Sequence, residues 1–141
     1  MEFANFVIDI QKGKMRELTA EYDERIKSIE AVKEGTLLNL NVSQEYAGQL
    51  NELVDGEGRV SEANRNRAEF IIGQLNSALG LELQLGADLI IRNGETGESY
   101  NEITNSINET IEAKKRDAEQ TAKLEIYQEA TNKKVRMQYE R

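Results

Sequence analysis

Apolar residues recur at spacings of three, four or eight along the first part of the chain, which is the pattern of a helix that buries one face. The residues on this stripe are Phe6, Ile10, Leu18, Tyr22, Ile26 and Ile29. The pattern predicts a helix over residues 2–32, with charged residues on its other faces. Gly13 is a weak point at which the helix could bend or begin, because glycine inside a helix costs about 1 kcal/mol relative to alanine. Gly35 predicts the end of this helix or a break in it.

Residues 36–54 fit two periodicities. Leu38, Leu40 and Val42 alternate with other residues as they would in a strand, but a helical face also runs to the end of the segment. The residues on that helical face are Leu37, Val42, Tyr46, Leu50 and Leu53. We therefore expect a helix from about Thr36, or alternatively from Ser43, to Val54.

The stretch from Leu53 to Val60 predicts a tight connection between two helices. Its central residues, Asp55 to Gly58, tolerate the left-handed backbone that turns require. Ser61 has the type of side chain that caps a helix N-terminus. The expected next helix has a broad apolar stripe of Ala68, Ile71, Ile72, Leu75, Ala78 and Leu79. Gly80 is expected to terminate it as the glycine after the last helical turn.

A short patch after Gly80 departs from the helical period. Residues 81–85 alternate apolar and polar side chains, residues 86–88 can turn, and residues 89–92 have the composition of a strand. This order predicts a short β-hairpin. Because an isolated hairpin is only marginally stable, we expect it to pack on the helices.

The last 44 residues, from Glu98 onward, contain no glycine or proline. Ser99 and Glu102 have the spacing of a capping box at a helix start. The apolar stripe that follows comprises Ile103, Ile107, Ile111, Ala118, Ala122, Ile126 and Ala130. A helix of this length spans about 65 Å, so it must extend beyond a small core or pair with the first helix or another chain.

These patterns predict a mainly α fold: a helical hairpin core with a minor β-hairpin and long amphipathic arms of coiled-coil type. We expect an N-terminal arm at residues 1–34, the core with its β patch at 35–97 and a C-terminal arm at 98–141. The residues expected to hold the core together are Leu53, Val54, Phe70, Ile71, Leu75 and Leu79. Both ends lie in charged, helix-forming sequence, so we expect a fragment of a longer helical polypeptide.

The amino-acid composition excludes some kinds of binding and catalytic site and disfavours others. The net charge of −8 disfavours direct binding of nucleic acid, because such binding needs a clustered basic surface. Cysteine and histidine are absent, so there is no thiolate zinc site, no cysteine nucleophile and no imidazole base or ligand. No window is apolar enough to predict a membrane span. We expect no enzyme activity, no catalytic residue, no metal site and no cofactor.

Three stretches have a weak likeness to binding motifs. Residues 55–60 resemble a calcium loop, but the alignment places Leu53 at the first ligand position and Asn64 where a glutamate belongs, so we expect a tight turn. Residues 93–97 lack the Gly-Lys-Ser/Thr ending of a phosphate loop, and we expect a linker. The basic residues at 114–116 and 133–134 could suggest nucleic-acid binding. They lie among acidic residues, however, so we expect an ordinary solvated helix face.

The segment from Val42 to Ala130 resembles a module of tail tape measure proteins from long-tailed phages and prophages of Gram-positive bacteria. The motifs that carry the resemblance are Leu53-Val54-Asp55-Gly56-Glu57-Gly58-Arg59-Val60, the run from Asn66 to Gly80, Tyr100 with Ile103 and Ile107, and Thr110-Ile111-Glu112-Ala113-Lys114-Lys115. The family pattern reads LVDENG-V, F-LG-LN-ALG and I---I-AKKA. Gly56 and Glu57 depart from it, because they replace the usual Glu-Asn of the turn.

The resemblance implies a large, mostly helical protein that occupies the lumen of the tail tube and sets tail length during assembly. It is expelled when DNA enters the host. The implied partners are copies of the same chain, the tail tube protein and tail assembly chaperones. The implied locations are the virion tail lumen and, during assembly, the host cytoplasm. The alternative hypothesis is a coiled-coil adaptor that binds a partner helix in a groove.

Overall fold

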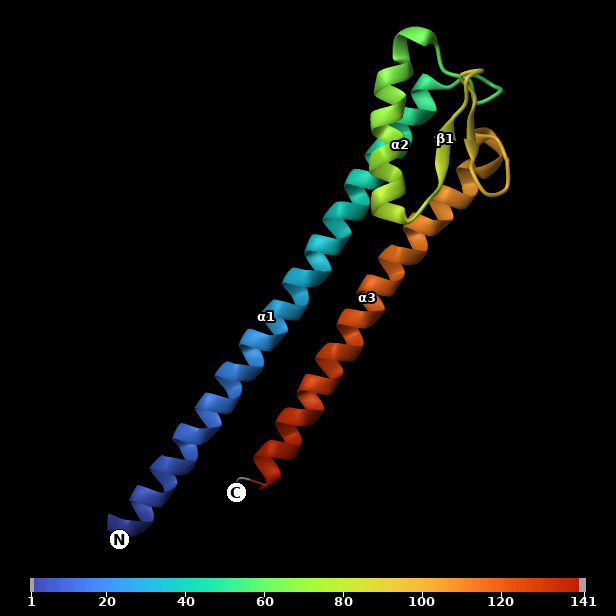
Figure 1. Cartoon of the computed structure of the whole chain (residues 1–141). Helices are drawn as coiled ribbons and strands as arrows, with labels where there is room; N and C mark the ends of the chain where they lie inside the picture. The colour runs from blue at the N-terminus through green and yellow to red at the C-terminus, as the bar shows by residue number, and fades with distance from the viewer. Residues whose placement is uncertain (1, 140–141) are drawn as a thin grey trace. The chain divides into compact units, whose positions relative to one another are not determined.

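The computed structural model describes the backbone of residues 2–139 and the side chains of residues 12–139. The chain is mainly helical with one small antiparallel sheet, so the predicted fold class is confirmed. Its elements are the helices α1 (Glu2–Leu53), α2 (Arg65–Leu79) and α3 (Tyr100–Tyr139), a 3-10 turn η1 (Glu62–Asn64) and the strands β1 (Leu83–Leu85) and β2 (Ile91–Asn93) (Figure 1).

Helix α1 continues through Gly35 without interruption, so the predicted break there is wrong. The strand alternative at Leu38 to Val42 and the later helix start at Ser43 are also wrong, because the same helix includes all of these residues. Gly35 is exposed, and apart from the adjacent residues and the nearby backbone of the same helix no atom lies within 4 Å of the position that a Cβ would take. The penalty of about 1 kcal/mol for a single glycine is too small to end a helix of this length.

The chain divides into two compact units. One unit comprises residues 1–35 and 118–141, and the other comprises residues 36–117. The first part of α3 belongs to the second unit, although the sequence assigned all of 98–141 to an arm. The reason is that Ile103, Ile107 and Ile111 are buried in the core of that unit.

One hydrophobic core fills the 36–117 unit and draws on its three helices and both strands, whereas the 3-10 turn η1 contributes no buried residue. It comprises Leu40, Ala47, Leu50, Val60, Ala68, Ile71, Ile72, Leu75, Leu79, Leu83, Ile91, Tyr100, Ile103, Ile107 and Ile111. Of the residues expected to hold the core together, Ile71, Leu75 and Leu79 are buried as predicted, and Leu53 and Val54 are partly buried against the core. Phe70 is 57% exposed, so its assignment to the core is wrong.

The buried face of α1 in this unit differs from the predicted one. The buried residues are Leu40, Ser43, Ala47 and Leu50, whereas Val42 is 41% exposed. Small residues at two of these positions allow neighbouring elements to approach the helix closely. The Ser43 hydroxyl donates a hydrogen bond of 3.1 Å to the Asn39 carbonyl oxygen, which satisfies the polar group inside the core.

The sheet is the hairpin that the sequence predicts. Strands β1 and β2 pair antiparallel, with Leu83 opposite Asn93 and Leu85 opposite Ile91. Gly80 terminates α2 in a left-handed conformation at φ 66°, as expected. Asn76 of α2 fixes the position of the hairpin, because its side-chain amide makes hydrogen bonds of 2.9 and 3.0 Å to the backbone N–H and carbonyl of Leu83.

The two predicted helix caps have different outcomes. Ser61 precedes the 3-10 turn η1, but its side chain makes no capping hydrogen bond, so that prediction is wrong. The Glu102 carboxylate accepts a hydrogen bond of 3.2 Å from the Ser99 backbone N–H, which is one half of the predicted capping box.

The unit formed by residues 1–35 and 118–141 is a pair of helical arms. Leu18 and Ala122 are its buried apolar residues among those described, and Tyr22, Ile26 and Ile29 are half-buried. The side chains of Phe6 and Ile10, also on the predicted stripe, lie outside the described residues. The arms therefore share a thin apolar seam.

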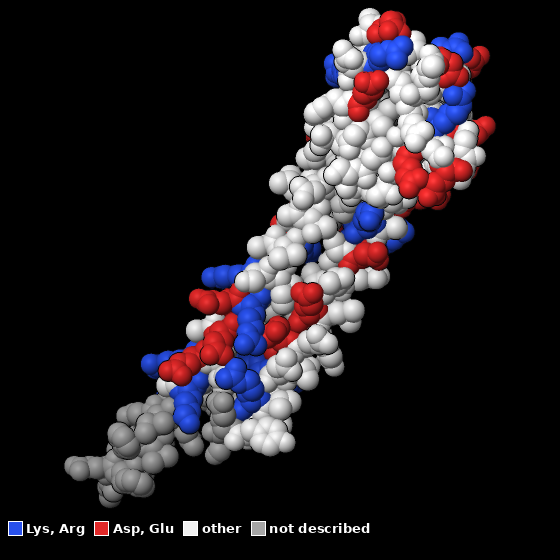
Figure 2. All heavy atoms as spheres, viewed as in Figure 1, with Lys and Arg blue, Asp and Glu red and all other residues white. Residues whose placement is uncertain are grey.

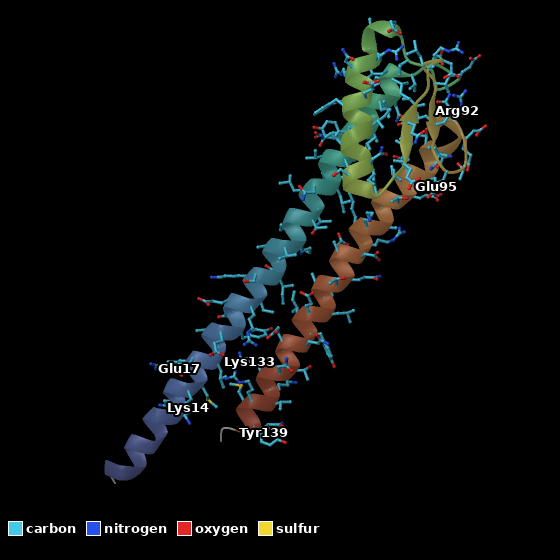
Figure 3. All side chains as sticks on the ribbon, in the orientation of Figure 1. Lys14, Glu17, Arg92, Glu95, Lys133 and Tyr139 are labelled. Atoms are coloured by element: carbon cyan, nitrogen blue, oxygen red, sulfur yellow. The ribbon has the colours of Figure 1, made fainter. Side chains whose placement is uncertain are left out.

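Polar contacts supplement this seam. Arg25 pairs with Glu129 at 3.1 Å, and Arg136 pairs with Glu21 at 2.8 Å. The Lys133 ammonium lies 4.7 Å from the centre of the Tyr22 ring, and Figure 3 shows this lysine directed from α3 toward α1. The two arms thus contact each other within one chain.

Candidate functional site

The turn after α1 is built by Asp55. Its carboxylate oxygen Oδ1 accepts hydrogen bonds from the backbone N–H groups of Glu57 at 2.8 Å and Arg59 at 3.0 Å. These two bonds, first the one from Arg59, lower the pKa of Asp55. Gly58 has a φ of 79°, and Val54 and Val60 form a bridge across the turn. The carboxylate therefore organises its own backbone, and the tight turn predicted here is confirmed.

The same turn pairs with the loop of the hairpin. The Val60 N–H donates to the Leu89 carbonyl at 2.9 Å, and the Ile91 N–H donates to the Gly58 carbonyl at 3.0 Å. Arg92 pairs with Asp88 at 2.8 Å, and Figure 3 shows Arg92 on the outer side of the hairpin. The Arg92 hydrogen bond, together with the Ile90 N–H, lowers the pKa of Asp88 to about 2. This cluster of polar side chains has a structural role.

The loop before α3 is likewise held by its own side chains. Asn93 Oδ1 accepts hydrogen bonds from the N–H groups of Glu95 at 2.8 Å and Thr96 at 3.1 Å. The Asn93 N–H donates to the Glu98 carbonyl at 2.8 Å, which closes the loop. Two of the N–H groups that a phosphate would require are thus already bonded within the loop.

The basic residues singled out in the sequence lie on α3. Lys115 donates a hydrogen bond of 2.9 Å to Gln44 of α1 and lies 3.9 Å from Glu112. Lys133 contacts the Tyr22 ring. Each of these two lysines therefore contacts a side chain of α1.

The part of the chain that the structure describes offers neither a metal-binding group nor a membrane-spanning helix. In that part, no three or more His, Cys, Asp or Glu side chains are grouped so that they could hold a metal ion. None of the described helices is both long and apolar enough to cross a membrane. A hollow of about 450 Å³ between the two arms is lined partly by Glu21 and Glu129, and these carboxylates pair with Arg136 and Arg25.

The best candidate for an interaction site is a groove between α1 and α2 in the 36–117 unit, called here the α1/α2 groove. Its volume is about 260 Å³. Its walls comprise Asn39, Val42, Ser43, Tyr46, Gln74 and Ala78, and Leu40 also lines it. All of these side chains are uncharged. The groove therefore favours contact with apolar or neutral groups over charged ones.

Two large apolar side chains on α1 and α2 are exposed, and one of them, Phe70, contacts Tyr46 in the wall of this groove. Leu38 is 63% exposed and Phe70 is 57% exposed. The rings of Phe70 and Tyr46 meet edge to face, with centroids 6.1 Å apart and an interplanar angle of 76°. Figure 2 shows charged side chains gathered near the turns of this unit and an uncharged area over α2. An exposed apolar patch of this kind is typical of a protein contact.

Sequence reasoning missed this surface because it placed Phe70 in the core and Val42 on the buried helical face. Periodicity alone could have shown the error at Phe70, since the apolar stripe of positions 68, 71, 72, 75 and 79 leaves residue 70 on another face of the helix. It also missed Asn51 and Asn76, whose side chains bond to Tyr100 and Leu83. Comparisons of the chain with protein-family models, curated proteins and solved structures give no match.

Proposed function

We propose that this chain is a non-catalytic structural segment of a phage tail tape measure protein. One observation carries the proposal: the residues on which the resemblance rests build one folded core. Asp55 and Gly58 form the turn, and Ile71, Leu75 and Tyr100 are buried together in the 36–117 unit. The residues of the resemblance are therefore needed to fold this unit, as expected of a motif in a structural component.

The lengths of the helices support the same proposal. Helix α1 has 52 residues and α3 has 40, and neither contains proline. At 1.5 Å per residue, α1 alone spans about 80 Å. Stiff elements of this length suit a protein whose task depends on distance.

The pairing of the arms changes how such a segment would measure length. Contacts such as Arg25 with Glu129 and Arg136 with Glu21 join the two arms of one chain. A chain that folds back contributes less length per residue than a single extended helix. We therefore propose that the segment acts as a hairpin spacer.

A second candidate function is a coiled-coil adaptor that binds a partner helix. The α1/α2 groove favours this alternative, because its lining is uncharged and the exposed ring of Phe70 contacts Tyr46 in its wall. Helices that bind in grooves place apolar side chains at intervals of three or four residues. An adaptor of this kind does not have to be part of a phage particle.

Mass spectrometry of purified phage particles distinguishes the two functions. The particles would come from a phage or induced prophage that encodes this sequence. We expect peptides from residues 12–139 in intact particles and their loss after DNA ejection has been triggered. Peptides of the tail tube protein should remain in both samples and serve as the control. Absence of the chain from intact particles would refute the tape measure proposal and favour the adaptor.

A further inference from the structure

Asn93 and Gly94 form the only Asn-Gly pair in the chain. This dipeptide is the one most prone to spontaneous loss of the asparagine amide, because glycine has no side chain to shield its backbone nitrogen. The pair lies where strand β2 ends and the loop before α3 begins (Figure 1). We propose that Asn93-Gly94 is a latent deamidation site, which the pairing of β1 with β2 keeps unreactive and which reacts when the hairpin opens.

The reaction requires only water and hydroxide. The Gly94 backbone nitrogen loses its proton to hydroxide and attacks the side-chain carbon Cγ of Asn93. A bond forms between these two atoms, the bond from Cγ to Nδ2 breaks, and ammonia leaves with a proton from water, which restores the hydroxide. Water then opens the cyclic imide at either of its carbonyl carbons, and the product is aspartate or isoaspartate.

Two hydrogen bonds fix the peptide group that must turn for this attack. The Gly94 N–H donates to the Glu82 carbonyl of the other side of the hairpin at 2.7 Å. The Asn93 carbonyl accepts from the Gly97 N–H at 2.9 Å. Rotation about the Asn93 Cα–C bond, which brings the Gly94 nitrogen toward Cγ, breaks both bonds. The folded chain therefore keeps the nucleophile away from the side chain that it would attack.

The side chain that would be attacked is also held in place. Asn93 Oδ1 accepts hydrogen bonds from the backbone N–H groups of Glu95 at 2.8 Å and Thr96 at 3.1 Å. A swing of the side chain toward the Gly94 nitrogen breaks these bonds. Because both reacting groups are fixed by separate bonds, the attack requires the loop and the end of β2 to loosen together.

The residues that make this pair labile are the ones that shape the loop. A Cβ atom at position 94 would lie 2.8 Å from Gln84 Nε2 and 3.1 Å from the Glu82 carbonyl oxygen, so a side chain there would crowd the other side of the hairpin. The Asn93 side chain supplies the oxygen that turns the loop. The fold thus favours the most reactive dipeptide at this point and also restrains it.

The pairing that protects the site is short. Strands β1 and β2 have three residues each, and the Asn76 amide of α2 holds them through its two bonds to the Leu83 backbone. Such a ladder opens locally more readily than the core of the unit. Isoaspartate formed during an opening lengthens the main chain by one carbon atom just before Gly94, so the bond to Glu82 cannot re-form in register. This inference does not depend on the proposed function.

Incubation of the full chain in buffer and in urea, at the same mildly alkaline pH, tests the proposal. Peptide mapping by mass spectrometry locates the mass gain of deamidation. Isomerisation at Asp55-Gly56 does not interfere, because it leaves the mass unchanged. We expect Asn93 to react before the other asparagines in urea, and about tenfold or more slowly in the folded chain. A rate in buffer that equals or exceeds the rate in urea, or another asparagine that reacts first in urea, would overturn the proposal.

Two variants test whether the hairpin is the restraint. Asn76→Ala removes the bonds that hold Leu83, and Gln84→Gly, at an exposed position, weakens β1 without a change in the core. Each should raise the rate at Asn93 in buffer by about threefold or more and leave the rate in urea unchanged.

The matched control is Asn132→Ala, at an exposed residue of α3 outside the 36–117 unit. It should leave the rate at Asn93 unchanged in buffer and in urea. Circular dichroism verifies that each variant is folded in buffer. If neither folded hairpin variant raised the rate in buffer, or if Asn132→Ala raised it equally, the pairing of β1 with β2 would not be what protects Asn93.

Discussion

The hydroxyl group of Tyr100 donates a hydrogen bond of 2.6 Å to Oδ1 of Asn51. It also lies 3.2 Å from the carbonyl oxygen of Ala47. The first residue of α3 is thereby joined to the last turns of α1, and its ring is only 1% exposed. Tyr100, one of the residues on which the resemblance to tape measure proteins rests, thus joins α3 to α1 in the core of the 36–117 unit.

Tyr100→Phe should destabilise the chain by about 1–2 kcal/mol, because it leaves the Ala47 carbonyl without this partner in the core. Urea denaturation of the variant and the unaltered chain measures the difference. Tyr127→Phe is the matched control, since Tyr127 is 72% exposed and should change stability by less than about 0.5 kcal/mol. Equal effects of the two variants would show that the Tyr100 hydroxyl has no special role.

The same residue predicts a dependence on alkaline pH. Burial raises the pKa of Tyr100 from 10.0 to about 12. The folded chain therefore holds this proton more tightly than the unfolded chain, and its stability should fall as pH rises from about 10 to about 12. The fall should be smaller in Tyr100→Phe. A parallel pH profile for both proteins would contradict a raised pKa at Tyr100.

Asp88 predicts a dependence at acid pH with the opposite sign. The Arg92 hydrogen bond and the Ile90 N–H hold its pKa at about 2, below the usual 3.8. The stability contributed by the ionised carboxylate is present above the usual pKa and is lost as pH falls toward 2. A carboxyl titration followed by NMR should show this pKa. Arg92→Gln should move it upward, whereas Arg67→Gln, at an exposed arginine of α2, should not.

The sequence predicted the fold class, the turn, the hairpin and the start of α3, because each has a local signal. Asp55 with its glycines, Gly80, and Ser99 with Glu102 are signals of this kind. It could not predict which face of α1 is buried, since Leu38, Leu40 and Val42 are all apolar and only the packing of α2 and α3 distinguishes them. For the same reason the α1/α2 groove could not be found from the pattern alone.

Gly35 and Gly58 predict opposite responses to alanine. Gly35 lies in the middle of α1 with open space around it, so Gly35→Ala should stabilise the chain by about 0.5–1 kcal/mol. Gly58 has a φ of 79°, a conformation that alanine rarely adopts, so Gly58→Ala should destabilise it. Thermal denaturation of both variants measures the signs. Destabilisation by Gly35→Ala would contradict the open space around this position, because it would mean that the added methyl group meets a neighbouring atom.

Leu75→Ala tests the assignment of α2 to the core. Leu75 has no exposed surface, and its loss should cost about 2–5 kcal/mol through lost burial and a cavity. Ser77→Ala, at an exposed position two residues later, should change stability by less than about 0.5 kcal/mol. If Leu75→Ala had as small an effect as Ser77→Ala, the core would have to lie elsewhere.

The arms should open more readily than the core of the 36–117 unit. Their seam buries few apolar side chains, and exposed ion pairs such as Arg25 with Glu129 contribute only about 0.2–1 kcal/mol. Arg25→Glu should speed hydrogen exchange at amides of residues 118–139 by about twofold to fivefold, and the swap Arg25→Glu with Glu129→Arg should restore it. Exchange at residues 65–79 serves as the control. An equal change in the exchange rates of residues 118–139 and of residues 65–79 would contradict the expectation that the arms open separately from the core.

The most direct test of the account is the tail length of phage particles in which residues 1–141 have been deleted or duplicated, measured by electron microscopy. Because the pairs Arg25 with Glu129 and Arg136 with Glu21 hold the two arms side by side, a hairpin spacer should shorten or lengthen the tail by no more than about 80 Å, the length of α1. Gly35→Ala particles, which keep the same number of residues, should have unchanged tails. A change of about 210 Å would mean that the chain lies in the tail as one extended helix. An unchanged tail in both the deletion and the duplication would contradict a role in setting tail length.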